Sequence, residues 1–264
     1  MGNNLHERAE QLKALGRLLD IMDELRVKCP WDREQTFESI RNNTIEETYE
    51  LADAILKKDM IHIKKELGDL LLHIVFYSRM GSETGEFDIK DVADAISDKL
   101  IFRHPHVFGE TDVKNNPEIV KRNWEELKIK EGNHSVLGGV PGSLPALIKA
   151  NRIQEKARAI GFDWDKRTQV WDKVQEELNE LKVEIEKMDQ EKMTEEFGDL
   201  LFSVVNAARL YHVDPETALE LTNQKFITRF TYLESKNLKK GRKLKEMTLD
   251  EMNEIWEEAK RSRE

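Results

Sequence analysis

The feature that most constrains this 264-residue chain is an internal repeat of acidic motifs. Two motifs with acidic residues three positions apart stand in the first half, and two more stand 130 positions later. The glycine and the leucines around the later motif of each half also recur. A repeat at a constant offset is typical of a duplicated structural unit, so the sequence predicts two similar domains. The motifs are Glu47-x-x-Glu50, Glu66-x-x-Asp69, Glu177-x-x-Glu180 and Glu196-x-x-Asp199.

Both halves show apolar residues at helical spacing, whereas alternating strand patterns are scarce. Asn116-Pro117 and Asp214-Pro215 each place a capping side chain before a proline, and Thr248-x-x-Glu251 has the form of a capping box. The predicted fold is therefore all-α, with tandem duplicated helical bundles. Helices are expected near 5–26, 44–57, 60–79, 88–103 and 117–130, and near 143–160, 168–188, 190–212, 215–236 and 248–262.

Glycine, serine and proline gather between the two halves, which predicts a linker there. We expect an N-terminal domain over 1–131, a linker over 132–143 and a C-terminal domain over 144–264. Each domain is long enough to form a core of its own.

The overall composition limits the classes of partner and the compartment. With a net charge of −10 and 36% charged residues, the chain is poorly suited to binding nucleic acid by bulk electrostatics. Its one cysteine, Cys29, excludes an internal disulfide and favours a reducing compartment. No stretch has the apolar length that spans a bilayer, and residues 1–20 hold no uninterrupted apolar run. We therefore expect a cytoplasmic protein with no signal peptide and no membrane partner.

The acidic pairs predict a cation site in each half. Residues three apart share one face of a helix, so two antiparallel helices can bring four carboxylates together. Two like charges about 4 Å apart repel by roughly 4 kcal/mol near a protein surface, so protons or a cation must relieve the repulsion. Oxygen ligands favour Mg²⁺, with Mn²⁺ as a substitute. A di-iron bundle needs Glu-x-x-His motifs, and neither acidic motif supplies the histidine.

The alternative interpretation is that each motif is a solvated helix face, which is the usual role of a single Glu-x-x-Glu. Glu47 would then be the capping-box partner of Thr44. This interpretation does not explain why Asp69 and Asp199 each precede an apolar run, because carboxylates seldom border a core stripe without a partner. The metal site is therefore the favoured hypothesis.

Cationic and aromatic residues follow the acids along the chain. Lys225 and Arg229 are one helical turn apart, matched by Lys99 and Arg103 in the first half, and such a pair can grip phosphate oxygens. The indole of Trp256 can stack on a base. Taken alone, the cations fit a solvated stripe and the tryptophan fits a core. Together with the acids they predict a nucleoside polyphosphate site.

These motifs make the chain resemble the MazG family of all-α nucleoside triphosphate pyrophosphohydrolases. The most specific segments are Cys29–Asp32 (CPWD) and His104–Phe108 (HPHVF), whereas the acidic pattern alone is shared with dimeric dUTPases and phosphoribosyl-ATP pyrophosphohydrolases. The resemblance covers nearly the whole chain, in the two-domain arrangement of the bacterial full-length members. It implies Mg²⁺-dependent hydrolysis of (deoxy)nucleoside triphosphates between the α and β phosphates, to monophosphate and pyrophosphate, by a homodimer.

The resemblance also implies a role for each candidate site residue. The base would be Glu176 or Glu177. The metal ligands would be Glu177, Glu180, Glu196 and Asp199, with a second, weaker metal site at Glu47, Glu50, Glu66 and Asp69. The substrate-binding residues would be Lys192, Asn223, Lys225, Arg229 and Trp256.

The second copy is expected to carry most of the turnover. His62 stands where the second copy has Lys192, and Ser97 stands where it has Asn223, so the first copy lacks a permanent cation and an amide. Two other classes of function stay open from the residues alone: a helical regulatory module that binds nucleotide without hydrolysing it, and a structural dimer scaffold. Pyrophosphate release from triphosphates separates the enzyme from both.

Overall fold

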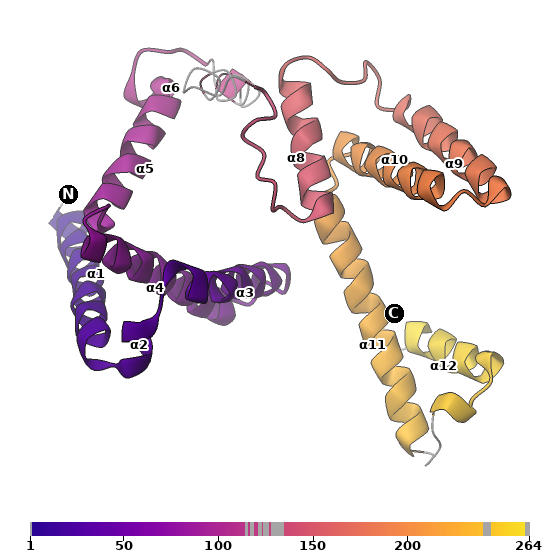
Figure 1. Cartoon of the computed structure of the whole chain (residues 1–264), viewed down its shortest axis with the longest axis horizontal. Helices are drawn as coiled ribbons and strands as arrows, with labels where there is room; N and C mark the ends of the chain where they lie inside the picture. The colour runs from indigo at the N-terminus through magenta and orange to yellow at the C-terminus, as the bar shows by residue number, and fades with distance from the viewer. Residues whose placement is uncertain are drawn as a thin grey trace. The chain divides into compact units, whose positions relative to one another are not determined.

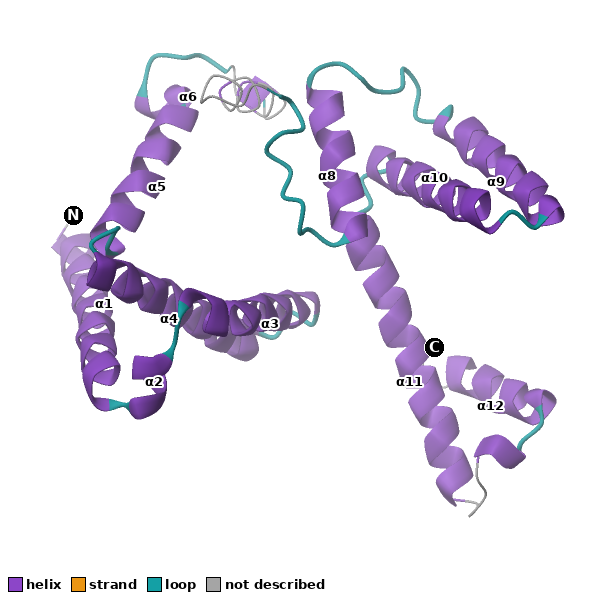
Figure 2. Cartoon of the chain, viewed as in Figure 1, coloured by secondary structure: helices purple, strands orange, loops and turns teal. Residues whose placement is uncertain are grey.

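The computed structural model describes residues 2–113, 135–239 and 244–261, together with 116, 119, 120, 123 and 127. Over these residues it contains helices and no strand, which confirms the all-α prediction (Figure 2). The chain divides into two compact units, Met1–Asp112 and Val113–Glu264. Most of the helix expected near 117–130, and the expected domain boundary at 131, lie outside the described residues.

The first unit is built around one long helix, α4 (Met60–Thr84), on which α1, α3 and α5 pack (Figure 1). Its core is a cluster of Met22, Ile40, Val75, Phe76 and Met80. The helices of this unit, besides α4, are α1 (Gly2–Lys28), α2 (Pro30–Glu34), α3 (Phe37–Leu56), α5 (Ile89–Arg103) and α6 (Pro105–Phe108).

The start of α3 corrects one sequence interpretation. The helix begins at Phe37 rather than near residue 44, because Thr36 is its N-cap and accepts a hydrogen bond from the Ser39 N–H. Thr44 therefore lies inside the helix, where its hydroxyl donates to the carbonyl of Ile40. Glu47 is thus not the capping-box partner of Thr44. Two short helices, α2 and α6, were also not expected, and each has a proline in its first turn.

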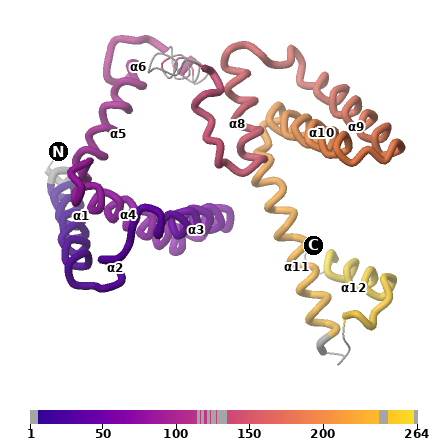
Figure 3. Tube along the Cα trace, viewed as in Figure 1, coloured from indigo at the N-terminus to yellow at the C-terminus, as the bar shows by residue number. Residues whose placement is uncertain are grey.

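The second unit combines a helical hairpin with a separate pair of helices. Helices α9 and α10 form the hairpin, and α10 also packs on α8 (Figure 3). Helix α11 packs against α8 and α12 rather than against α9. The helices are α8 (Ala146–Ala159), α9 (Val170–Lys187), α10 (Gln190–Leu210), α11 (Pro215–Lys239) and α12 (Leu249–Arg261), with a 3₁₀ turn at Leu244–Glu246.

Two capping predictions in the second unit are confirmed. The N–H of Thr217 donates to the Asp214 carboxylate, 2.8 Å away, at the start of α11. Before α12, the N–H of Thr248 donates to Glu251 at 2.8 Å, and the N–H of Glu251 donates back to the Thr248 hydroxyl at 3.3 Å. No helix in the described part of the chain combines the length and the hydropathy of a membrane span.

Candidate functional site

The same turn closes the α3–α4 and α9–α10 hairpins. Lys58 and Met188, which are 130 positions apart, both adopt left-handed backbone conformations, with φ of 55° and 58°. The next residues, Asp59 and Asp189, cap the following helices through their carboxylates. The backbone hydrogen bonds around each turn are those of a Schellman motif. Because turn and cap are equivalent, the acidic residues of the two hairpins take the same angular positions around their helices.

The first acidic cluster lies on the α3–α4 hairpin. Glu47, Glu66 and Asp69 each offer a carboxylate oxygen, and these oxygens lie within 4.8 Å of one another. Glu66 is buried, with 3% of its surface exposed. Glu50, the fourth predicted ligand, is exposed and does not belong to this group.

A lysine makes ion pairs at the edge of the first cluster. The ammonium of Lys65 lies 3.1 Å from both oxygens of Glu66, 3.4 Å from Asp69 and 4.0 Å from Glu50. The pKa of Lys65 is raised, chiefly by its hydrogen bond with Glu66. The first cluster therefore carries a cation of its own. The residue 130 positions later is Glu195, so this cation has no counterpart at the matching position.

The second acidic cluster lies on the α9–α10 hairpin. Glu177, Glu196 and Asp199 offer carboxylate oxygens within 4.8 Å of one another, and Glu177 is buried. Glu180 is exposed and lies outside this group, although its charge contributes to the raised pKa of Glu196. Lys173 makes ion pairs of 2.8 Å with Glu176 and 2.7 Å with Glu177. The fold thus brings together three of the four predicted metal ligands in each half.

The electrostatics of both clusters favour a bound cation. The pKa of Glu196 is raised by burial and then by the charges of Glu180, Asp199 and Glu177. In the first cluster the pKa of Glu47 is raised by burial and by its acidic neighbours, against the effect of Lys65. Glu47 and Glu196 each bury one carboxylate oxygen that has no hydrogen-bond partner. A divalent cation would satisfy these oxygens and relieve the repulsion, so the residues present fit a metal ion.

Of the predicted phosphate and base ligands, Lys192 shares α10 with the second cluster, and the others lie on α11 and α12. Lys192 is exposed in the first turn of α10, one turn before Glu196. On α11 the guanidinium of Arg229 lies 5.8 Å from the ring centre of Trp256, whose ring also packs against Phe226. The amide of Asn223 donates a long hydrogen bond of 3.4 Å to Glu220 of the same helix.

These α11 and α12 residues do not reach the second acidic cluster within one chain. In the described part of the chain, no hydrogen bond or ion pair joins Lys225, Arg229 or Trp256 to the acids of that cluster. Their assignment to the substrate stays a prediction.

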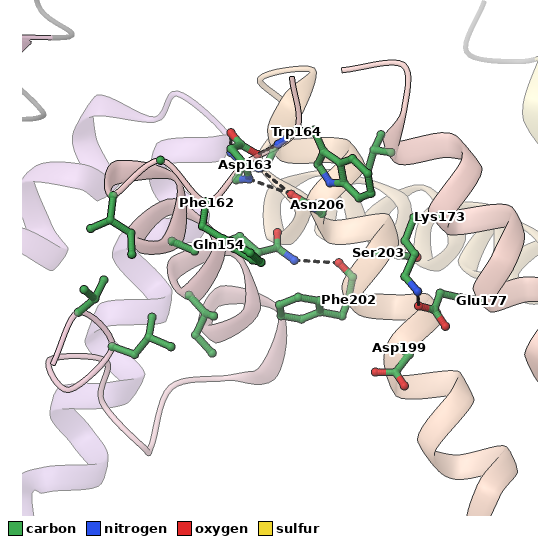
Figure 4. A pocket seen from close by; sticks show the side chains of 18 of the residues that line it. Gln154, Phe162, Asp163, Trp164, Lys173, Glu177, Asp199, Phe202, Ser203 and Asn206 are labelled. Atoms are coloured by element: carbon green, nitrogen blue, oxygen red, sulfur yellow. Dashed lines mark hydrogen bonds and ion pairs between the residues drawn. The ribbon is translucent and has the colours of Figure 1, made fainter. Parts of the chain in front are cut away.

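Sequence reasoning missed the two lysines of the clusters and a cavity beside the second one. Lys65 and Lys173 precede Asp69 and Glu177 by four positions, a spacing that signals a helical ion pair. The cavity has a volume of about 900 Å³ and is lined mainly by apolar side chains of α8, α9 and α10 and the loop before α9. Figure 4 shows Lys173, Glu177 and Asp199 gathered at one side of it. The cavity is therefore apolar over most of its wall and borders the acidic cluster at one side.

The fold and the clusters define a class: an all-α protein with a duplicated carboxylate hairpin suited to a divalent cation. Residues 35–108 and 167–233 match the MazG nucleotide pyrophosphohydrolase domain, and each matched segment contains one acidic cluster. The chain belongs to the MazG nucleotide pyrophosphohydrolase family, which confirms the resemblance indicated by the sequence motifs.

The amino-acid sequence is similar to those of proteins from several bacteria. It is 44% identical over 259 residues to the nucleoside triphosphate pyrophosphohydrolase of Escherichia coli (strain K12), covering 95% of this chain and 98% of that protein. It is 44% identical over 248 residues to the nucleoside triphosphate pyrophosphohydrolase/pyrophosphatase MazG of Thermotoga maritima, covering 92% and 94% of the two chains. A nucleoside triphosphate pyrophosphohydrolase of Mycobacterium tuberculosis is 36% identical over 152 residues, or 55% of this chain and 46% of that protein.

Proposed function

We propose that this protein is a nucleoside triphosphate pyrophosphohydrolase that cleaves between the α and β phosphates in the presence of Mg²⁺. The observation that carries the proposal is the carboxylate cluster of Glu177, Glu196 and Asp199, which lies in a segment that matches a nucleotide pyrophosphohydrolase family. The names of the E. coli and T. maritima relatives support the substrate class.

The metal would be held by the carboxylates of the α9–α10 hairpin. Glu177, Glu196 and Asp199 supply converging oxygens, and Glu180, one turn from Glu177, is the proposed fourth ligand. The buried oxygen of Glu196 that has no partner supports a cation at this point. When bound, Mg²⁺ neutralises phosphate charge and lowers the pKa of a water molecule, and Mn²⁺ is the expected substitute.

The reaction adds water to one phosphoryl group and breaks one phosphoanhydride bond. Glu176 or Glu177 would accept a proton from the attacking water, and the products are nucleoside monophosphate and pyrophosphate. Lys173 contacts both glutamates, so it restrains their orientation. Lys192, Lys225 and Arg229 are the proposed phosphate ligands, Asn223 is a proposed sugar or phosphate contact, and Trp256 is the proposed contact to the nucleoside.

The exposed apolar residues of α10 support a homodimer. Phe197, Leu201 and Val204 lie at helical spacing on one side of α10, with 50%, 58% and 45% of their surfaces exposed. In the first unit Leu67 and Ile74 occupy matching positions on α4 and are also about half exposed. A stripe of this kind in both units favours burial against a second copy of the chain.

One assay tests the activity and a pair of variants tests the site. Pyrophosphate release is measured from a mixture of nucleoside triphosphates with Mg²⁺, and its absence, with nucleotide still bound, would leave only a non-hydrolysing binding module. Glu177→Ala/Glu180→Ala is expected to abolish release. The matched variant Glu47→Ala/Glu50→Ala is expected to keep a substantial fraction. Retained helix content and oligomer mass control for folding, and the opposite ranking would move the main site to the first unit.

The domain limits of 1–131 and 144–264 and a cytoplasmic location remain part of the proposal. The single cysteine supports a reducing compartment. Limited proteolysis with mass determination of the fragments tests the domain limits, because cleavage concentrates at exposed linkers.

A further inference from the structure

Part of the linker between the two halves forms a wall of the cavity beside the second acidic cluster. Residues 135–142, called the linker strap from here on, lie outside both segments that match the family. They run beside α8 before that helix begins (Figure 1). Val136 and Leu137 of the strap line the cavity together with side chains of α8, α9 and α10. A segment outside the matched domain thus borders the same cavity as Glu177 and Asp199.

The strap is held to the helices by few contacts. Its backbone hydrogen bonds form turns within the segment, such as the one from the N–H of Gly138 to the carbonyl of Ser135 at 3.2 Å. Its last residue is tied to α8, where the ammonium of Lys149 donates to the carbonyl of Gly142 at 2.6 Å. In the described part of the chain, no backbone hydrogen bond joins the strap to α9 or α10. A segment with so few restraints opens locally at a small cost in free energy.

Apolar side chains in the cavity lining still have surface to bury. Leu137 keeps 45% of its surface exposed although it lines the cavity. Phe162, on the loop after α8, also lines the cavity and is 80% exposed (Figure 4). Because burial of apolar surface is favourable, an occupant of the cavity that touches these side chains stabilises the strap in a closed position.

We propose that the linker strap is a gate, which closes on the cavity when a ligand reaches the acidic cluster and opens to let the ligand enter and leave. The inference rests on the proposed function, which supplies the ligand. Closure places Val136 and Leu137 against the occupant and excludes water from a cavity that Glu177 borders. The linker is then a working part of the site as well as a connection between the halves.

Ligand exchange rates distinguish a gate from a fixed wall. A fixed wall only contributes contacts to the bound ligand, so loosening it raises the dissociation rate alone, whereas a gate slows entry as well as exit. Lys149 ties the strap and lies outside the cavity lining, so Lys149→Met loosens the strap and leaves the wall intact. Lys245→Met removes the same charge from an exposed residue of the same unit and is the matched control.

Binding of α,β-methylene-ATP with Mg²⁺ to the full chain is followed by stopped-flow tryptophan fluorescence, to which Trp164 of the cavity wall contributes. We expect Lys149→Met to raise the association and dissociation rate constants together, each about threefold, with little change in Kd. Lys245→Met should match wild type in both rates.

Hydrogen exchange gives a second measurement that needs no variant. In wild type, saturating α,β-methylene-ATP should slow exchange of the amides of residues 136–140 about tenfold, because closure restrains the strap. In Val136→Ser/Leu137→Ser, which removes the apolar contacts, the ligand should no longer slow this exchange. Val140→Ser, in the same segment but outside the cavity lining, should keep the protection.

Two results would overturn the gate. One is exchange at residues 136–140 that is equally fast with and without the ligand. The other is a Lys149→Met protein in which the association rate matches wild type. Either result, obtained with a wild type that releases pyrophosphate, refutes the gate alone. A wild type that neither releases pyrophosphate nor binds the analogue would instead refute the proposed function, and the gate with it.

Discussion

The ammonium of Lys65 lies 3.1 Å from each carboxylate oxygen of Glu66. A cation of the chain itself thus pairs with two acids of the first cluster, Glu66 and Asp69, and competes there with a divalent ion. The matching position in the second cluster is Glu195, which adds negative charge. The second cluster has a lysine of its own at another position, Lys173, 2.7 Å from Glu177. The two clusters therefore differ in where the lysine lies, in Glu195, and in having Lys192 where the first has His62.

Removal of this cation should strengthen metal binding at the first cluster. In a Glu177→Ala/Glu180→Ala background, Lys65→Met is expected to raise Mn²⁺ affinity about tenfold, because the ion no longer competes with an ammonium held by the same oxygens. Isothermal calorimetry measures the affinity. Lys64→Met, at an exposed neighbour, is the control, and equal affinity in the two variants would count against the competition.

Activity should depend on a divalent cation of the right size. We expect no pyrophosphate release in excess chelator, recovery with Mg²⁺ or Mn²⁺, and little turnover with Ca²⁺, which accepts looser and higher coordination. Steady-state pyrophosphate assays with each ion check this. Full activity in chelator would refute the metal assignment.

The ion pair of Asp163 with Arg209 should stabilise the second unit in a pH-dependent way. Burial alone would raise the pKa of Asp163, but the hydrogen bonds from Arg209 and from the N–H of Trp164 lower it overall. The carboxylate therefore contributes stability above its unfolded pKa, near 4, and loses it as the pH falls through the lower folded value. Asp163→Asn should cost about 2 kcal/mol at neutral pH.

Denaturant unfolding of wild type and Asp163→Asn from pH 7 to pH 3 measures this contribution. The difference between them should stay constant down to about pH 5 and shrink below pH 4. Asp165→Asn, an exposed neighbour, should match wild type throughout. A difference that persists unchanged at pH 3 would contradict the assignment to the carboxylate charge.

The left-handed residues of the two hairpin turns predict stabilising substitutions. Met188 is 78% exposed and adopts φ of 58°, so Met188→Gly removes backbone strain at little loss of packing. We expect a gain of about 1 kcal/mol in the free energy of unfolding, and a similar gain for Lys58→Gly. Lys57 has φ of −76°, and Lys57→Gly should therefore destabilise. Thermal unfolding compares the three, and a loss at Met188 would contradict the argument.

The apolar stripe of α10 predicts a homodimer that one charge can disrupt. Leu201→Asp should lower the mass to that of a monomer at micromolar concentration, because the aspartate would be buried without a partner. Light scattering measures the mass. Leu249→Asp places the same change on an exposed leucine of α12 and should leave the dimer intact. A wild-type monomer would refute the prediction outright.

The helices that carry the acids were predictable because their pattern is local. Apolar runs after Asp69 and Asp199 indicate α4 and α10, although part of each run is exposed, and the caps of α11 and α12 are visible in short motifs. The early start of α3 was missed because the capping partner of Thr36 is Ser39 rather than the Glu or Gln of the usual box. The short helices α2 and α6 were missed because five and four residues are too few to show an apolar period.

The cavity could not be predicted, because it is formed by contacts between residues that are distant in the sequence. Gln154 and Phe202 are far apart in the sequence and meet only when α8 packs on α10. A glutamine on an amphipathic helix gives no sign that its oxygen will be buried. Similarly, Lys65 looks like one half of a surface pair within α4, and its contact with Glu50 of α3 requires the hairpin to be closed.

The equivalent turns at Lys58 and Met188 give the two hairpins the same backbone geometry at the point where the chain reverses. Each hairpin has the same spacing between its acids, the same backbone reversal and the same aspartate at the start of its second helix. A chain in which the α3–α4 segment is replaced by a copy of α9–α10 should therefore keep its helical phase without adjustment of the junctions. Each hairpin therefore serves as an internal reference for the other, since a substitution made in one has a counterpart 130 positions away at which the same change can be compared.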